Sequence, residues 1–507
     1  MIALLQVFAA MAQQNHGSYL LADELQLWRS TENAAGMNID MKDSADNRGM
    51  AAMNYTYSGG SYRRVQQGGQ LNMLNLFTER YQKIGNYLYG YGSFAFDMGR
   101  RKERAWSDVM PTDASTPANP YISGSSIRGK YDNQDFRLTA KLATVKFRNL
   151  SYGAALYYNV ADESRLRDPR SRVRLADYKL APSIVYSSGN SSLGLAAWYH
   201  RRKEKLVGLK TVQTDPGLKY YIMTGLEHAE GTVGGYSAYW RENVAHEGGT
   251  ELSYGYKDDR LNSHTSLSFC KTTEFAYGQY KYEPGRFHVY SYGASTHNRL
   301  KTADRLLHSI DLSLNYHEAY ADQFSSQLIT EKDGPYTTLY WQKDMTYRKR
   351  YQAKMLDLEA HYRLSVVDPD GMKAWLGAGY MLQTSATKYL LPTSKADRRS
   401  SVFTVEGACG LIDKHLWLKA QADYRLKGRN ILDLNNEETD YAQEVLIPDM
   451  NYYDANWCKG TLELIYQHPV TLKKVTNNWF AKITGSYLKT DTRQSAGEIS
   501  ASIGLYY

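Results

Sequence analysis

The 12 His are the first place to look for chemistry, because imidazole serves as acid, base and metal ligand. No two of them lie at i, i+4, and His246-Glu247 is followed by Gly248-Gly249-Thr250, so the second His of an HExxH zinc motif is absent. The chain has no GxSxG nucleophile elbow and no GxxxxGK(S/T) phosphate loop. We therefore assign no catalytic residue, metal or cofactor, and predict that the protein is not an enzyme.

A barrel hydrolase remains a third possibility because three His fall on or near faces that we expect to point inward. These are His200, His361 and His415, and Asp423 or Glu359 would partner a His only if neighbouring strands align. The alternative is that these side chains are satisfied by opposite charges or by water. The three Cys, which form no CxxC pattern, are expected to be free, buried thiols.

Clusters of basic residues are the stronger candidates for binding. They border segments that we expect to form outer loops, which places them at one rim of the molecule. Arg suits bidentate contacts with phosphate, so we expect contact with lipopolysaccharide phosphates or attraction of an anionic ligand, against the alternative of a solvated rim. Nucleic acid is not expected, since the net charge is only +8 for 507 residues. The candidates are Arg100, Arg101, Arg201, Arg202, Lys203, Arg348, Lys349 and Arg350.

The elements that must position these residues are β-strands. The chain is polar, with a mean hydropathy of −0.57, yet it holds 44 Tyr and only 12 Pro. Leu416, Leu418 and Tyr424 alternate with the charged residues Lys419, Asp423 and Arg425, which we place on the lumen face. Such alternation over about 9–11 residues is typical of strands that cross a membrane with lipid on one side and a polar lumen on the other.

The same alternation predicts an all-β fold, a transmembrane antiparallel up-and-down β-barrel of about 18 strands within a range of 14 to 18. Connections alternate between short turns and long loops, and we leave Tyr220–Glu227 and Gly234–Glu242 as a hairpin within the loop 203–248. We expect strands at 50–58, 71–79, 87–98, 133–144, 150–160, 176–186, 192–202, 249–257, 263–271, 287–295, 306–317, 348–364, 372–383, 401–411, 415–427, 454–467, 479–489 and 497–507.

The two ends of the chain fit an exported barrel. Residues 1–12 are apolar and finish on Ala10-Met11-Ala12, so we predict a signal peptide there. The basic n-region of such a peptide is missing, which leaves two alternatives: either the true start codon lies upstream, or the segment is a buried helix and not a signal. The last strand alternates up to Tyr506-Tyr507 and is expected to pair with the first strand. Residues 13–48 do not alternate and are predicted to form a periplasmic segment or a plug, and 49–507 the barrel with long extracellular loops.

Two resemblances accompany this interpretation. Asn33, Ala34, Ala35 and Gly36 are similar to the Asn-Pro-Ala element in the N-terminal hatch of the long-chain fatty acid transporter family, with Ala34 in place of Pro. Taken whole, the chain resembles large, Tyr-rich outer-membrane barrels of Bacteroidota, in particular an uncharacterised family of about this length. The resemblance implies a multi-pass barrel in the outer membrane of a Gram-negative bacterium, and it implies no activity.

Composition and resemblance together favour transport across the outer membrane, by a channel or a substrate transporter. The alternative is a non-catalytic accessory subunit of a larger outer-membrane complex, whose partner would be another barrel or a surface lipoprotein. A TonB-dependent transporter itself is not expected, because such barrels have about 22 strands around a separate plug, whereas only residues 13–48 precede the first strand here. The substrate, the oligomeric state and the openness of the lumen do not follow from the sequence.

Overall fold

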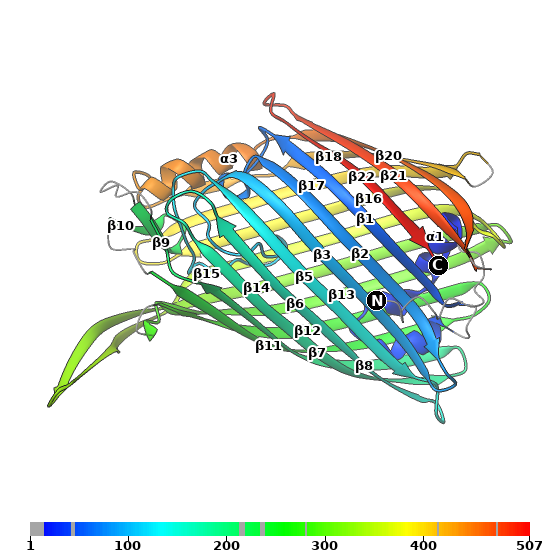
Figure 1. The fold of residues 1–507 in the computed structure, drawn as a ribbon, viewed down its shortest axis with the longest axis horizontal. Helices are drawn as coiled ribbons and strands as arrows, with labels where there is room; N and C mark the ends of the chain where they lie inside the picture. The colour runs from blue at the N-terminus through cyan, green and yellow to red at the C-terminus, as the bar shows by residue number, and fades with distance from the viewer. Residues whose placement is uncertain are drawn as a thin grey trace.

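A computed structural model describes residues 15–41, 46–211, 219–233, 239–278, 281–412, 415–472 and 475–507. The predicted signal peptide at residues 1–12 lies outside the described residues. The chain forms a closed antiparallel barrel whose wall has 18 strands, in which each strand pairs with the next and the last pairs with the first (Figure 1). The predicted fold class and strand number are therefore confirmed.

All 18 predicted strands are present, and most are longer than predicted. Their order around the wall follows the chain, with closure between Met50↔Tyr506 and Gly60↔Ala496. The wall consists of β1 (Arg48–Gly60), β2 (Gln70–Ile84), β3 (Leu88–Arg104), β5 (Gly129–Thr144), β6 (Leu150–Arg165), β7 (Arg172–Ser188), β8 (Ser191–Leu206), β11 (Arg241–Lys257), β12 (Leu261–Tyr277), β13 (Gly285–Ala303), β14 (Leu306–Asp333), β15 (Tyr336–Asp368), β16 (Gly371–Tyr389), β17 (Ser394–Gly410), β18 (Leu416–Lys427), β20 (Trp457–Leu472), β21 (Val475–Thr490) and β22 (Ser495–Tyr506).

The two faces of the wall differ as the alternation predicts. Leu376, Leu462 and Ile503 are more than half exposed on the outer face, whereas Asp97 and Glu406 are buried on the lumen side. Exposed apolar side chains circle the barrel, which is the surface that a lipid bilayer covers. The three Cys are free, but Cys458 is exposed because it lies on the outer face of β20, so the expectation that all three are buried is wrong for that residue.

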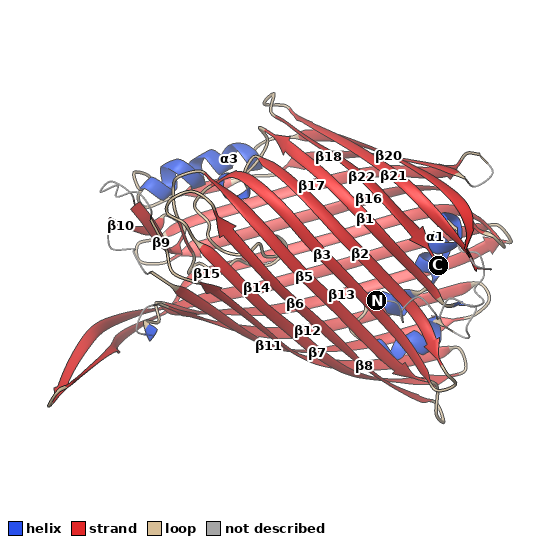
Figure 2. Cartoon of the chain, in the orientation of Figure 1, coloured by secondary structure: helices blue, strands red, loops and turns tan. Residues whose placement is uncertain are grey.

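The two ends of the barrel differ in the length and structure of the segments that connect the strands. At the turn end, short connections such as 189–190 and 369–370 join the strands, and the helices of residues 15–41 and the C-terminus lie there (Figure 2). At the loop end, long segments carry structure of their own, including β4 (Ser123–Gly124), β19 (Ile431–Asp433) and the 3-10 turn η5 (Val65–Gln67). The segment before β20 forms a π-helical turn, η7 (Ala442–Leu446), that leads into α3 (Ile447–Tyr453); neither was predicted. The helices of the described residues are all too short or too polar to cross a membrane.

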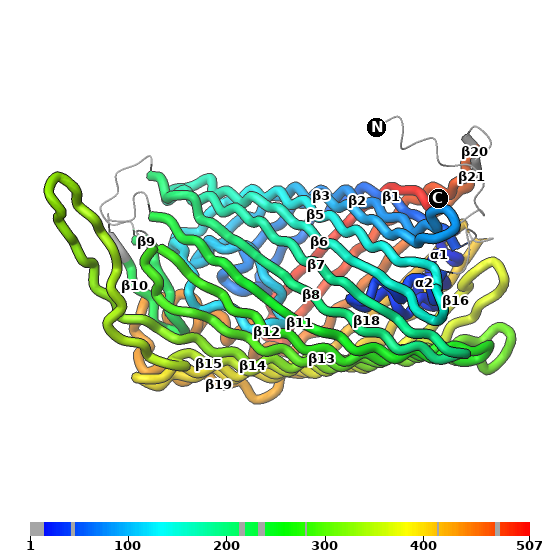
Figure 3. The backbone as a smooth tube through the Cα atoms, turned by 90° about the horizontal axis from the view of Figure 1, so that it is seen from below, coloured from blue at the N-terminus to red at the C-terminus, as the bar shows by residue number. Residues whose placement is uncertain are grey.

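Two of the predicted loops contain hairpins, and the second of these hairpins was expected. The segment 318–347 continues β14 and β15 far beyond the rim as a two-stranded ribbon (Figure 3). The pair left within 203–248 forms as β9 (Lys219–Gly225) and β10 (His228–Val233), because the chain turns at Leu226, where φ is +43°. The second predicted strand, Gly234–Glu242, is therefore displaced toward the N-terminus, and 234–238 lie outside the described residues.

The N-terminal segment runs through the lumen at the turn end. It consists of α1 (His16–Leu25), the 3-10 turns η2 (Leu27–Ser30) and η3 (Ala34–Gly36), and α2 (Met37–Asp40). The side chain of Asn15 accepts a hydrogen bond from the Ser18 N–H, 2.9 Å, which caps α1. α1 packs against β16, and η3 packs against β5, β6 and β7. The segment from Asn15 to Met41, called the lumen segment below, is thus held by opposite sides of the wall.

Candidate functional site in the barrel lumen

Two glycines of the wall leave room for close contact with the backbone of the lumen segment. A Cβ on Gly153 of β6 would stand 2.3 Å from the backbone nitrogen of Ala35, and one on Gly371 would stand 2.4 Å from the backbone nitrogen of Ser18. Backbone meets backbone at both contacts, so neither neighbour could simply rotate away from a larger residue. These contacts place the segment at defined points of the wall.

The four residues singled out for their hatch-like pattern lie in this contact. Ala34 and Ala35 are almost fully buried, as is Asn33. The Ala35 N–H donates to Ser183 Oγ at 3.1 Å, and the Asn33 side-chain amide donates to the Ile184 carbonyl at 3.2 Å, both on β7. Gly36 packs under the Trp28 ring, where a Cβ would collide with it. Their role here is therefore close packing between the segment and the wall.

Ion pairs add to the packing. Glu24 of α1 is 9 % exposed and contacts two arginines of the wall, Arg299 of β13 at 2.9 Å and Arg363 of β15 at 2.8 Å. On the other side, Lys179 of β7 reaches Glu32 at 2.6 Å. Breaking one member of a buried pair leaves the other charge less compensated, so Glu24 is a strong tie between segment and wall.

The lumen segment leaves a cavity beside α1 at the turn end. This cavity, called the α1 cavity below, has a volume of about 320 Å³ and lies between α1 and the wall from β15 to β20. Both signs of charge line it, together with two indole rings and several aliphatic side chains. The lining residues on which the argument rests are Asp23, Glu24, Arg363, Trp375, Ala408, Trp417, Lys419 and Glu463.

Some donors at this cavity have no partner in the described part of the chain. Trp417 is 97 % buried, and neither its indole N–H nor the Nε of Arg363 makes a hydrogen bond there. The Arg363 guanidinium lies over the Trp375 ring, 4.3 Å from its centre, and the Lys419 ammonium is 5.3 Å from the same ring. A buried donor without an acceptor costs free energy, so the cavity is suited to a guest that supplies acceptor atoms.

The three predicted lumen charges all point inward, but they separate along β18. Lys419 lines the α1 cavity and lies 3.3 Å from Glu406. Asp423 accepts hydrogen bonds from Thr404 and Gln421 within the wall. Arg425 donates to the Tyr62 hydroxyl at 2.9 Å and to the Tyr452 carbonyl at 3.1 Å, which ties the α3 loop to the wall at the loop end.

Two of the three candidate His residues lie beside carboxylates, although not beside those considered from sequence. His361 lies 2.9 Å from Glu406, and His200 lies 2.6 Å from Asp177. Asp423 and Glu359 make no hydrogen bond to a His in the described residues, and His415 contacts the Gln467 carbonyl. Strand register, which decides these partners, is a property of the whole sheet.

A Ser–His pair was missed by sequence reasoning. Ser291 Oγ lies 2.8 Å from His317 Nδ1 across β13 and β14. In the described residues no carboxylate is hydrogen-bonded to the other ring nitrogen, so the orienting third member of a hydrolytic triad is absent there. The same residues contain no group of three His, Cys, Asp or Glu that could hold a metal ion.

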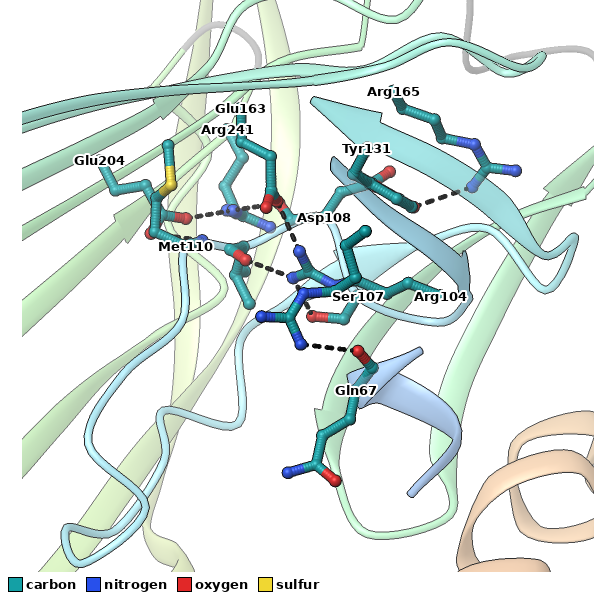
Figure 4. A network of polar contacts seen from close by, with 12 residues as sticks. Gln67, Arg104, Ser107, Asp108, Met110, Tyr131, Glu163, Arg165, Glu204 and Arg241 are labelled. Carbon is teal, nitrogen blue, oxygen red and sulfur yellow. Dashed lines mark hydrogen bonds and ion pairs between the residues drawn. The ribbon is translucent and has the colours of Figure 1, made fainter. Parts of the chain in front are cut away.

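The loop end is narrowed by the segment 105–128, which folds onto the inner wall. Asp108 is fully buried and accepts hydrogen bonds from Tyr131 at 2.8 Å and Tyr220 at 3.0 Å. Two buried ion pairs flank it, Arg104–Glu163 at 2.6 Å and Arg241–Glu204 at 2.7 Å (Figure 4). Each charged group of this network has a partner among the described residues, although the Nε atom of Arg241 makes no hydrogen bond there. Partners for buried charges are what allow such a network to stabilise a structure.

The predicted rim cations divide between the two faces. Arg101 and Arg202 point inward and bind the Gln67 carbonyl and Glu204. Arg100 points outward and pairs with Asp132 at 2.6 Å, and Arg201 and Lys203 also point outward. Arg348, Lys349 and Arg350 sit at the base of the β14–β15 ribbon, where Arg350 donates to the Leu390 and Leu391 carbonyls.

A closed antiparallel barrel with an apolar outer face and a charged lumen defines a transmembrane β-barrel of the kind found in bacterial outer membranes. The chain belongs to a family of unknown function (DUF6850), whose model matches residues 34–507. Among curated proteins, none matches this chain.

Solved structures with a similar arrangement include three outer-membrane proteins. OccAB3 of Acinetobacter baumannii is 12 % identical with a TM-score of 0.37, covering 91 % of this chain and 99 % of its own. The FrpB iron transporter of Neisseria meningitidis is 8 % identical with a TM-score of 0.41, covering 92 % and 82 %. The outer membrane transporter YddB of Escherichia coli is 8 % identical with a TM-score of 0.36, covering 90 % and 81 %. Similarity at this level says nothing about what this chain binds.

Proposed function

We propose that this protein carries small polar solutes across the outer membrane through its lumen, passing the lumen segment at the α1 cavity. The observation that carries the proposal is the cavity itself, since about 320 Å³ stays open between α1 and the wall from β15 to β20. Resemblance of the sequence to Bacteroidota barrels supports the outer membrane of a Gram-negative bacterium as its location. The turn end then faces the periplasm.

The cavity lining favours a solute with charged or hydrogen-bonding groups. Lys419 and Arg363 stand opposite Glu24, Asp23 and Glu463. A zwitterionic or polar molecule can meet both signs, while a long acyl chain would remove water from these charges and offer them no hydrogen bonds in return. The hatch-like residues Asn33–Gly36 would suggest a fatty acid, but they are buried against β6 and β7 and lie away from the α1 cavity.

Filling the cavity tests the proposal. Ala408 lines it from the inner face of β17, and Val405 lies on the lipid face of the same strand, 58 % exposed. In proteoliposomes, Ala408→Phe should reduce the uptake of small zwitterions and the ionic conductance severalfold, because the new ring occupies the passage. Val405→Phe should leave both unchanged. Equal uptake by the wild type, by Ala408→Phe and by protein-free vesicles would refute transport by this route.

An accessory subunit of a larger outer-membrane complex is the second candidate, and the β14–β15 ribbon favours it. Leu328, Tyr336 and Met345 on this ribbon are 43–75 % exposed beyond the rim. Apolar residues so exposed in water commonly mark a docking surface for another protein. Native purification distinguishes the two candidates: a barrel or lipoprotein that co-elutes in fixed ratio supports the subunit role, and an active lone barrel supports transport.

A further inference from the structure

A group of cations stands on the outer face of the wall near the loop end. Arg172 and Arg174 belong to β7, and Arg201, Lys203 and Lys205 belong to β8; together they are called the basic patch below. The register places Arg174 opposite Lys205, Ala176 opposite Lys203, and Tyr178 opposite Arg201. Opposed residues of an antiparallel pair point to the same side, so these side chains form one continuous surface.

That surface faces outward. Tyr178 and Tyr199, which lie on the same face of their strands, are 36 % and 45 % exposed, whereas Glu204, which alternates with Lys203 and Lys205, is buried in the lumen wall. The side chains of Arg172 and Arg174 are about half exposed. The patch is therefore open to whatever surrounds the barrel.

The position of the patch along the barrel axis matches the outer headgroup level. Leu180, Leu193 and Leu195 form the apolar band on this side, each about half exposed. Tyr178 and Tyr199 lie at its edge, as aromatic side chains do at a membrane interface. The patch begins directly beyond these two tyrosines, where the band ends and the headgroups of the outer leaflet begin.

Intramolecular acids neutralise only part of this charge. Asp162 lies 2.7 Å from Arg172 and 3.4 Å from Arg174, and Glu242 lies 3.0 Å from Lys203. Within the described residues, Arg201 and Lys205 form no ion pair, and the Lys205 ammonium instead lies 5.6 Å from the centre of the Trp240 ring. Among the described residues, five cations of the patch thus face two carboxylates.

We propose that the basic patch binds the phosphate groups of lipopolysaccharide in the outer leaflet. Guanidinium groups contact phosphate oxygens through paired N–H donors, and ammonium groups add charge without fixed geometry. The apolar band directly below the patch lies where the acyl chains of the same molecule would run. A phosphorylated lipid satisfies both parts of this surface, whereas a free anion would use only the cations.

The test measures lipid bound to the full-length barrel. Removing the two unpaired cations with Arg201→Gln and Lys205→Gln should lower the lipopolysaccharide retained after purification roughly tenfold or more, since each charge-assisted contact is worth about a factor of ten. As a matched control, Lys354→Gln with Lys395→Gln removes two cations that are paired with Glu318 and Asp433. That variant should retain wild-type amounts. Heat-modifiable migration on gels checks that each variant is folded.

A binding assay with added lipid identifies the chemistry. Purified lipopolysaccharide should bind the wild-type barrel, and enzymatically dephosphorylated lipopolysaccharide should bind it as weakly as lipopolysaccharide binds the Arg201→Gln, Lys205→Gln variant. Inorganic phosphate at millimolar concentration should compete poorly, because it lacks the acyl chains. Equal retention by the wild type and this variant, equal affinity for the dephosphorylated lipid, or full competition by free phosphate would overturn the proposal.

Discussion

Glu24 ties the lumen segment to two strands of the barrel wall. Its carboxylate lies in an almost fully buried position between Arg299 and Arg363, which belong to two strands of the wall. The Arg299 guanidinium also reaches Asp311 at 2.7 Å, and that of Arg363 also reaches Glu406 at 3.2 Å. Both arginines therefore stay partly compensated when Glu24 changes, while α1 loses its charged contacts to β13 and β15 and keeps the one between Asp23 and Arg48 of β1 at 2.9 Å.

Replacement of this carboxylate should loosen α1 without unfolding the barrel. Removing one partner of a buried ion pair typically costs about 3–5 kcal/mol, and we expect Glu24→Gln to lose the lower part of that range because the arginines keep other partners. Hydrogen exchange of residues 16–25 should accelerate, while exchange in β13 and β15 stays slow. Glu32→Gln is the matched control, since Glu32 and Lys179 are more exposed and their pair is weaker. Unchanged exchange in α1 would contradict this role.

The lumen segment carries two titratable groups whose effects on docking oppose each other. Burial raises the pKa of Asp40 from 3.8 to about 7, and burial, with Lys482 nearby, lowers the pKa of His16 from 6.5 to about 3. Between pH 4 and 7 the docked segment holds more protons at Asp40 than the free segment, so this group weakens docking as pH rises. The docked segment holds fewer protons at His16 between pH 3 and 6.5, so that group strengthens docking as pH rises.

Single substitutions should separate the two contributions. We expect docking of the wild-type segment to change little from pH 4 to pH 6.5, because the two slopes nearly cancel. Asp40→Asn should leave docking that strengthens as pH rises through this window, and His16→Gln should leave docking that weakens. The measurement is hydrogen exchange of residues 16–40, corrected for the intrinsic pH dependence of exchange. Slopes of the same sign in both variants would show that one of these groups is not enclosed as described.

The barrel as a whole consists of a continuously hydrogen-bonded wall and a two-stranded ribbon that projects from it. β14 pairs with β13 as far as Gln323, and β15 pairs with β16 from Tyr351 onward. Beyond those points, the two strands of the ribbon pair only with each other, down to Asp333↔Tyr336. An isolated two-stranded ribbon adds little to the stability of the domain that bears it.

Shortening the ribbon should therefore leave the barrel intact. Replacing residues 326–345 with a short Gly-Ser turn should preserve heat-modifiable migration and the thermal midpoint, because no wall pairing is lost. If the protein has a partner at the cell surface, that partner should no longer co-purify. A barrel that fails to assemble after this change would show that the ribbon contributes to folding.

Much of the fold follows from local sequence pattern. The alternation in segments such as Leu416–Lys427 sets which side chains face lipid and which face the lumen, since successive residues of a strand point to opposite sides. Strand number and the order of turns and loops follow from the same pattern. The lengths of the strands do not follow from it. The ribbon at 318–347 and the ends of β11 and β17 extend past the apolar band, and beyond that band the residues no longer show the alternation of a lipid-facing strand.

The candidate sites depend on contacts that no local pattern specifies. Sequence placed Lys419, Asp423 and Arg425 on one lumen face, but only the folded chain puts Lys419 beside a cavity and Arg425 under a loop. His361 meets Glu406 because β15, β16 and β17 adopt one register, and Arg201 separates from Arg202 because alternation sends adjacent cations to opposite faces. Alternation repeats every two residues and is readable locally. Register aligns whole neighbouring strands, and closure and the path of residues 15–41 through the lumen join residues hundreds of positions apart. The energies of these contacts are decided only when the barrel closes.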